Sequence, residues 1–509
     1  MKKRFILFLL LIARLLVKGE ENALIEHTLS KAKTIITGES KKQDGEVTLI
    51  CYKGIIRGAY KSSIIEVTVP IVKGRFKIIL PDIGQGTYFD IVGAGFKSKS
   101  MGPIVEKYLI ESGDSVHVDF QIGVVKYSGK SGIKLKCQND IGSIKSFAWK
   151  KPADAFKYRK MDSWDVNYLK YRIEQIDSLY NLKFNSLSSY RNKLPAGFYS
   201  RLYVDLSLEK AARFYSDVLR FIRVAKNKDR VDSLILFYNS FTKPVMYRNE
   251  TEAELVSISR KFDESVWNKF QCDIIYSNYK LGVHEIDNAD FFQIIGKIRD
   301  EYKGSIRERL VVSACYVGYT YITYKGTEDE YELLNECIYD TKSQFFKDVL
   351  VEFADANTKG RSVLNFELPD PAGDIVRLSD FKGKVVFIDF WYTGCTACAK
   401  YYKQIVSKVE ERFIKDTSVV FITISPDKDW GKWLASVESN TYTSKRVVNL
   451  NAGKGEYIMK KYQVTGFPRP YLLDRDLKIY SANRGELWDE EKLVALIKAA
   501  LSEKCMKED

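Results

Sequence analysis

The 509-residue chain contains very little histidine: His27, His117 and His284 are its three histidines, and all lie before residue 362. A structural zinc site normally needs four Cys or His ligands, usually as two close pairs. The chain has one close pair of cysteines, Cys395 and Cys398, and no histidine near it in sequence. We therefore expect no metal site, and we interpret the isolated His117, which lies in a strand-like pattern, as a structural or surface histidine.

Cysteine is also sparse, with eight residues in the whole chain. This number excludes a small disulfide-stapled scaffold. Buried, unreactive thiols are the default interpretation of the cysteines outside the close pair. A disulfide between Cys51 and Cys137 in an oxidising compartment stays an alternative. The scattered cysteines are Cys51, Cys137, Cys272, Cys315, Cys337 and Cys505.

Long apolar runs are missing beyond the first segment, "MKKRFILFLLLIARLLVKGEENA". A basic cluster at residues 2–4 precedes nine apolar residues, 5–13, before Arg14 interrupts them. Nine residues are too few to span a bilayer, which takes about 20. The pattern predicts a secretory signal peptide at 1–19, and hence export to the periplasm or cell envelope. The alternative is an uncleaved N-terminus that associates with the membrane.

No sustained basic stripe accompanies the formal net charge of +14. Residues 1–19 carry five basic and no acidic residues, so removing them from +14 leaves +9. Residues 361–509 hold 24 Lys and Arg against 21 Asp and Glu, which is close to neutral. A Lys-rich solvated surface explains this distribution, so we predict no nucleic-acid partner.

The pattern of apolar residues divides the chain into three predicted domains. Residues 30–125, which include "GEVTLICYKG" and "GTYFDIVGAG", alternate apolar and polar residues between turn signals and predict a small all-β, sandwich-like domain. Residues 150–355 repeat apolar residues at spacings of three and four, which predicts a central α-helical domain. The polar stretch "DANTKGRS" then precedes a third domain at 362–505.

The third domain combines two kinds of strand connection. The buried strand "KVVFIDFW", the helix "CTACAKYYKQIVSKVEERF" and the strand "SVVFITIS" follow one another, which favours a parallel pair. Later, "PYLLDRD" and "KIYSAN" are joined by a short turn, which favours an antiparallel hairpin. We therefore expect an α/β domain with a mixed sheet.

The close cysteine pair lies where the first of these strands turns into a helix. Peptide N–H groups point outward at a helix start, and the helix dipole favours an anion there. A thiolate is stabilised in that position and becomes nucleophilic near neutral pH. The two-residue spacing then lets the second thiol attack a mixed disulfide formed at the first. This geometry favours a redox centre over zinc binding or simple core packing.

Residues 362–503 resemble the thioredoxin-like family, and within it the TlpA and ResA type of exported thiol-disulfide oxidoreductase. The resemblance rests on three segments in order: "FELPDPAGDIVRLSDFKGKVVFIDFWYTGCTAC", "VVFITISPDKD" and "YQVTGFPRPYLLD". It implies a thioredoxin fold and an enzyme that exchanges disulfides. No organic cofactor or metal is implied.

The resemblance also implies roles for five residues. Cys395 would be the attacking thiol and Cys398 the resolving thiol. Pro468 would follow a cis peptide bond facing the cysteines, with the backbone of Phe467 pairing to an extended client segment. Asp389 would be the buried acid below the resolving cysteine, suited by its apolar site to proton transfer.

Trp391 and Gly394 complete the predicted client-binding surface, Trp391 as a wall of the site. Gly394 departs from the large residue usual before the first cysteine, and Thr396-Ala397 replaces the usual Gly-Pro. Lys403 stands where many relatives have a helix-kinking proline. These departures leave the reduction potential open.

Relatives of this type usually act as reductants, for example on cytochrome c apoproteins. The expected partners are therefore client proteins with disulfides and an upstream thiol electron donor in the membrane. Thiol peroxidases share the fold but need a proline and a Thr or Ser where this chain has Ile388 and Tyr392. Two alternatives remain: an envelope binding or assembly protein with an accessory redox domain, and a disulfide isomerase.

Overall fold

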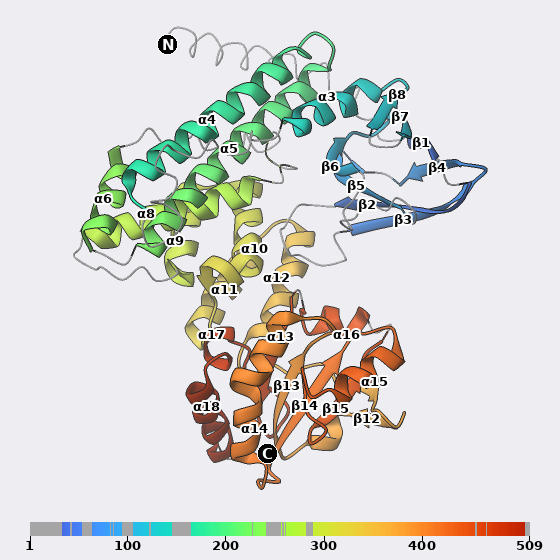
Figure 1. The fold of residues 1–509 in the computed structure, drawn as a ribbon. Helices are drawn as coiled ribbons and strands as arrows, with labels where there is room; N and C mark the ends of the chain where they lie inside the picture. The colour runs from blue at the N-terminus through green and yellow to red at the C-terminus, as the bar shows by residue number, and fades with distance from the viewer. Residues whose placement is uncertain are drawn as a thin grey trace.

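A computed structural model describes residues 33–503, with breaks at 41–42, 53–63, 82, 85, 94–104, 122–123, 145–163, 226–227, 241–255, 257–258, 260, 281–288, 454–455 and 465. The predicted signal peptide at 1–19 lies outside the described residues, as do His27, His284 and Cys505. Figure 1 shows three parts in chain order: a sheet, a group of helices, and a second sheet with its own helices. We name them the sheet part, the helical part and the C-terminal part.

The sheet part consists of eight strands in the order β6-β5-β2-β3-β4-β1-β7-β8. Neighbouring strands are antiparallel except β1 and β7, which are parallel. Exposed and buried side chains alternate along β4, as the sequence pattern predicts. The strands are β1 (Thr34–Ser40), β2 (Asp44–Tyr52), β3 (Ile64–Val72), β4 (Arg75–Leu80), β5 (Thr87–Gly93), β6 (Val105–Ile110), β7 (Ser115–Gln121) and β8 (Val124–Ser128).

One hydrophobic cluster joins the two halves of this sheet. Leu49 of β2 and Phe89 of β5 belong to it, and so do Ile36 of β1 and Val118 of β7 from the other half. The halves β6-β5-β2-β3 and β4-β1-β7-β8 therefore share a core, which is what a sandwich-like arrangement requires.

The helical part packs its long helices side by side (Figure 1). The apolar face of α5, the longest of them, is buried between α4 and α8, in line with the predicted three- and four-residue spacing. A two-stranded sheet, β9 (Ala289–Asp290) and β10 (Ile322–Thr323), lies within this part. The helices are α3 (Gly132–Ser143), α4 (Val166–Ser188), α5 (Ala196–Val224), α6 (Lys228–Ser240), α8 (Phe262–Lys280), α9 (Phe291–Glu301), α10 (Gly304–Tyr321), α11 (Glu328–Asp340) and α12 (Gln344–Asn357).

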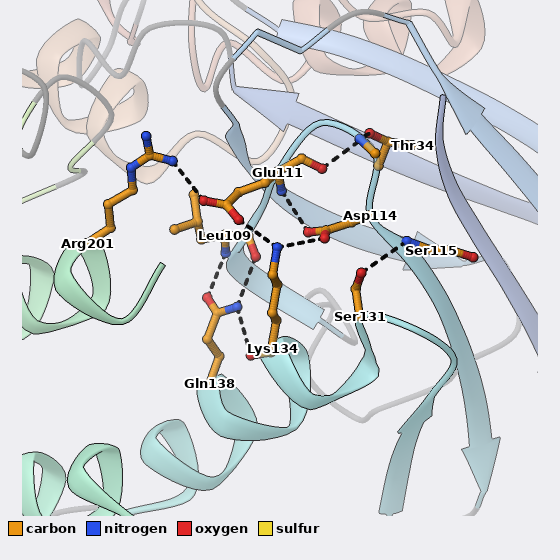
Figure 2. A network of polar contacts seen from close by, with 10 residues as sticks. Thr34, Leu109, Glu111, Asp114, Ser115, Ser131, Lys134, Gln138 and Arg201 are labelled. Carbon is orange, nitrogen blue, oxygen red and sulfur yellow. Dashed lines mark hydrogen bonds and ion pairs between the residues drawn. The ribbon is translucent and has the colours of Figure 1, made fainter. Parts of the chain in front are cut away.

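A charged network joins the sheet part to the helical part (Figure 2). Lys134 of α3 places Nζ 2.6 Å from Glu111 Oε2 and 2.7 Å from Asp114 Oδ1. Arg201 of α5 binds the other oxygen of Glu111 at 2.8 Å. Gln138 fixes α3 to β6 by hydrogen bonds with both the N–H and the carbonyl of Leu109. We call Lys134, Glu111, Asp114 and Arg201 the front joint.

The C-terminal part is built on a five-stranded sheet in the order β15-β14-β13-β16-β17. Strands β13, β14 and β15 are parallel, whereas β16 is antiparallel to both β13 and β17. This confirms the predicted mixed sheet. The elements are β11 (Glu367–Pro369), β12 (Ile375–Arg377), β13 (Val385–Phe390), α13 (Thr396–Tyr401), α14 (Ser407–Phe413), β14 (Val419–Ser425), α15 (Trp430–Glu438), β15 (Val448–Asn451), α16 (Glu456–Lys461), β16 (Arg469–Leu473), β17 (Ile479–Ser481), α17 (Arg484–Leu487) and α18 (Glu490–Ser502).

Side chains of the central strand β13 are all buried and divide between two cores. Ile388 and Phe390 join the cluster that contains β16 residues and Tyr462. Val385 and Phe387 join the cluster that contains α13, α14 and α18. Because side chains alternate along a strand, Asp389 lies on the same face as Phe387, beneath the helix that follows the cysteine pair.

The helical part and the C-terminal part meet through buried polar contacts. Arg469, the first residue of β16, donates from Nη2 to Asn357 Oδ1 at the end of α12, at 2.7 Å. Gln463 Nε2 donates to the hydroxyl of Tyr316 in α10 at 3.0 Å. We call these four residues the rear joint. The predicted limits of the three domains stay predictions.

Among the helices that the structure describes, none combines the length and apolar character that crossing a membrane requires.

Candidate active site

The cysteine pair occupies the turn between β13 and α13. Cys395 is the N-cap of α13, and its Sγ accepts a hydrogen bond from the N–H of Cys398 at 3.0 Å. The two sulfur atoms form a disulfide, with the Cα atoms 5.3 Å apart. Both side chains are buried, whereas the intervening Thr396 and Ala397 are exposed. The predicted strand-to-helix location of the pair is therefore confirmed.

The backbone conformation at position 394 explains why this chain has glycine where relatives have a large residue. The φ of Gly394 is +94°, a region that residues with a Cβ rarely adopt, and open space surrounds the position of a hypothetical Cβ. Glycine is therefore favoured by the backbone conformation and not by crowding. The N–H of Gly394 donates to the hydroxyl of Tyr442 at 3.0 Å, which fixes the turn just before Cys395.

The helix after the cysteines changes its winding at Tyr402–Val406, which form a π-helical turn between α13 and α14. Lys403, which stands where many relatives have a helix-kinking proline, lies in this turn. A π-helical turn bends a helix without proline, because one extra residue enters the turn. The sequence alone did not predict this π-helical turn.

The proline turn faces the site as the resemblance implies. The Phe467–Pro468 peptide bond is cis. Phe467 packs against the small cluster that contains Cys395 and Cys398, and its ring centroid lies 5.1 Å from that of Tyr392. The structure thus brings the two predicted motifs, separated by 70 residues, to one place.

Trp391 is completely buried and belongs to the same cluster as the cysteines. Its ring stacks on Tyr442, with 5.0 Å between the centroids and 11° between the planes. Trp433 of α15 also belongs to this cluster. Trp391 therefore packs against the cysteines from inside the protein, and its role at the client-binding surface stays a prediction.

Hydrogen bonds between Thr393 and two residues, Asp427 and Ser436, hold the loop between Trp391 and Cys395. Asp427 Oδ2 accepts from both the N–H and the hydroxyl of Thr393, at 3.0 and 2.6 Å. The hydroxyl of Thr393 also lies 2.8 Å from that of Ser436 in α15. Asp427 lies in the segment "VVFITISPDKD", and the sequence alone did not predict its role because the contact spans 34 residues.

Asp389 lies at the base of the site, only 2% exposed. Burial raises its pKa well above the usual range of a carboxyl group, while the charge of Arg484 and backbone hydrogen bonds from Arg469 and Phe390 act in the opposite direction. The carboxyl group is therefore suited to hold or accept a proton.

Arg484, the first residue of α17, is a site residue that sequence reasoning missed. Its Nη2 donates a hydrogen bond to the carbonyl oxygen of Pro468. No motif or local pattern marked this arginine, because its partner lies 16 residues earlier in another element.

The remaining described cysteines are buried thiols that form no disulfide. Cys51 and Cys137 belong to different hydrophobic clusters, and burial raises the pKa of each thiol to about 12. The structure therefore does not show the alternative disulfide between them. Within the described ranges, no three His, Cys, Asp or Glu side chains are grouped so as to hold a metal ion.

The family comparison locates its match in the C-terminal part. The AhpC/TSA family model matches residues 360–482. The thiol-disulfide oxidoreductase ResA of Bacillus thuringiensis subsp. konkukian (strain 97-27) is 31% identical over 135 residues, which are 26% of this chain and 73% of the relative. ResA of Bacillus subtilis (strain 168) is 23% identical over 132 residues, 26% of this chain and 69% of the relative.

Among solved structures, the thioredoxin domain of a thiol-disulfide oxidoreductase from Bacteroides vulgatus shares 27% identity, with a TM-score of 0.24. The match covers 28% of this chain and 96% of that one. The ResA relatives and the family model carry the assignment. Through its C-terminal part, the chain belongs to the thioredoxin-like thiol-disulfide oxidoreductases of the ResA type.

Proposed function

We propose that this protein is exported and uses Cys395 and Cys398 to reduce or exchange disulfides of client proteins in the cell envelope. The single observation that carries the proposal is the disulfide-bonded pair at a helix start, packed with Phe467 beside the cis-proline turn. The basic and apolar segment at 1–19 supports export.

In the first step of the proposed reaction, the thiolate of Cys395 attacks one sulfur of a client disulfide. A Cys395–client disulfide forms, and the other client sulfur leaves as a thiolate. The helix start and the Cys398 N–H favour the thiolate at Cys395, because both place positive charge beside the sulfur. Cys395 is therefore assigned the attacking role.

In the second step, the thiol of Cys398 gives its proton to the carboxylate of Asp389. Its sulfur then attacks Sγ of Cys395, so the Cys395–Cys398 bond forms and the client leaves as a thiolate. The client gains two electrons and the protein pair loses two. A thiol donor in the membrane would reduce the pair again.

Client binding is assigned to the surface around the proline turn. The Phe467 backbone would pair with an extended client segment, which is a common way to bind a peptide that carries a reactive group. Trp391 is completely buried and would support this surface from inside, whereas the exposed Gly394 would lie on it.

Insulin reduction in the presence of dithiothreitol tests the proposal. We expect the wild-type chain to accelerate reduction and Cys395→Ser to lose this activity. Cys398→Ser should retain attack but accumulate a mixed disulfide with the client, visible by non-reducing electrophoresis. Equal turnover by wild type and Cys395→Ser would refute the assignment.

A second candidate function is favoured by the rear joint, because it connects the helical part directly to the strand that follows Pro468. In this version the sheet and helical parts bind a partner or assemble in the envelope, and the redox pair serves that role. A disulfide isomerase is a further variant. Recovery of active enzyme from a scrambled disulfide-bonded substrate, without added oxidant, would favour isomerase activity over simple reduction.

A further inference from the structure

Arg484 connects the short helix α17 to the proline turn beside the cysteine pair. Its guanidinium holds the Pro468 carbonyl and stands 5.2 Å from the ring centroid of Trp488. Trp488 in turn stacks on Tyr401 of α13, again with 5.2 Å between the centroids. The hydroxyl of Tyr401 donates to the carbonyl of Leu487 at 2.7 Å. The short helix α17 is thus fastened both to the proline turn and to the helix that begins at the cysteines.

The positive charge of Arg484 also influences the pKa of the buried Asp389. This charge opposes the effect of burial on the pKa of Asp389, and also on the pKa of Tyr401. Asp389 and Tyr401 lie on one side of the sheet, since Tyr401 belongs to the cluster formed by that face of β13. Asp389 also lies opposite Pro470 in the β13–β16 pairing, two residues from the Pro468 whose carbonyl Arg484 binds. Arg484 is therefore near both the client-binding turn and the proposed proton acceptor.

We propose that Arg484 is a positioning residue of the exchange reaction: it fixes the carbonyl of Pro468 at the client-binding turn and places a permanent positive charge beside Asp389. The inference rests on the proposed function, because it assigns a role within that reaction. The charge of Arg484 is permanent because a guanidinium keeps its proton at every pH at which the protein functions.

The charge matters in the step that releases the client. Cys398 loses its proton to the Asp389 carboxylate, after which the Cys395–Cys398 bond forms and the Cys395–client bond breaks. The proton can be accepted only while Asp389 is ionised, and a neighbouring positive charge favours the ionised form. The hydrogen bond to Pro468 acts earlier, because it holds the turn in the shape that the client meets.

Two substitutions in the full-length chain separate these effects. Arg484→Met removes both the charge and the hydrogen bond, whereas Arg484→Lys keeps the charge but loses the planar donor arrangement. Arg412→Met is the matched control, because Arg412 lies on the surface and pairs with Glu490 and Glu491. Near-ultraviolet circular dichroism confirms that each variant is folded.

Insulin reduction over a range of pH gives the first measurement. For Arg484→Met we expect the acid limb of kcat to move up by about one pH unit, because Asp389 then protonates more readily. We also expect KM to rise about fivefold, from the loss of one hydrogen bond at the turn. Arg484→Lys should raise KM but leave the acid limb in place. Wild-type values of both quantities in Arg484→Met would overturn the inference.

A second measurement needs no client. The carboxyl carbon of Asp389 is followed by NMR in the full-length protein labelled at aspartate, and is assigned by its loss in Asp389→Asn. The titration midpoint should be higher in Arg484→Met than in wild type and unchanged in Arg484→Lys. An unchanged midpoint in Arg484→Met overturns the inference even if the protein reduces no client. Failure of the proposed function has a different signature, namely no insulin reduction by the wild-type chain.

Discussion

The two joints of the helical part differ in chemistry and in what they touch. The front joint pairs Lys134 and Arg201 with two carboxylates, far along the chain from the cysteines. The rear joint places the buried Arg469 against neutral oxygens, among them Asn357 Oδ1 and the Tyr471 hydroxyl at 2.9 Å. Arg469 also directly follows Pro468. Substitutions in the front joint should therefore lower only the stability of the fold, whereas substitutions in the rear joint should also lower the rate of disulfide exchange.

Lys134→Met should have the largest effect on stability. It removes the cation from the buried Asp114 and the half-buried Glu111. Losing one partner of a buried pair costs about 3–5 kcal/mol. Hydrogen exchange followed by mass spectrometry should show faster exchange in the sheet part, with insulin turnover unchanged. A fall in turnover at full folding would show that the front joint also reaches the site. Lys136→Met, which removes an exposed cation from the same helix, is the matched control.

A pH-dependent loss of stability should belong to the C-terminal part and to neither joint. Burial raises the pKa of Glu410 in α14 from its ordinary value of 4.5 to about 7. Between these values the folded chain binds more protons than the unfolded chain, so stability falls as the pH rises. The loss approaches about 3 kcal/mol and is complete above about pH 7. Denaturant unfolding at several pH values measures it.

Glu410→Gln is the control for this titration, because it keeps the neutral shape of the side chain. This variant should lose less stability than wild type over this pH range, and the loss that remains belongs to groups such as Asp389, whose pKa burial also raises. If wild type and Glu410→Gln lose stability equally, another group is responsible.

Asn357→Ala should weaken the rear joint by about 1.5–3 kcal/mol, the usual range for a hydrogen bond to a charged group. We also expect lower insulin turnover, because Arg469 is attached to the proline turn. Asn365→Ala is the matched control, because the exposed Asn365 accepts a hydrogen bond from the N–H of Ser379 and lies outside the rear joint. Turnover equal to wild type in Asn357→Ala would mean that the two joints do not differ in this respect.

Tyr316→Phe should have the smallest effect. It removes the acceptor of Gln463 and the donor to the carbonyl of Val349, two hydrogen bonds between neutral groups that contribute about 1 kcal/mol each. Thermal unfolding of the helical and C-terminal parts should shift slightly downward together. A shift confined to the helical part would show that Gln463 does not contribute to the rear joint.

The sequence was sufficient for features that depend on local pattern. Cys395, Cys398 and Pro468 lie in motifs with fixed spacing, and runs of apolar residues predicted the mixed sheet. Arg484, Tyr442 and the Asn357–Arg469 contact were not predicted, because each depends on residues that only the folded chain brings together.

Helix α3 was missed for a different reason. Its buried face includes Lys134 and Gln138, which are satisfied by the sheet part. A helix that buries polar side chains carries little apolar periodicity, so the pattern that revealed the other helices was weak here.

The short connection after α12 limits how the enzyme can reach its client. The N–H of Gly360 donates to the carbonyl of Ile479, and Ser362 pairs with Lys478, so this connection runs as an added edge beside β17. A connection that is hydrogen-bonded to β17 in this way cannot act as a flexible arm. We therefore expect the client segment to supply the motion that brings the reacting sulfur atoms into line. This would favour disulfides in exposed, extended chain over those in rigid cores.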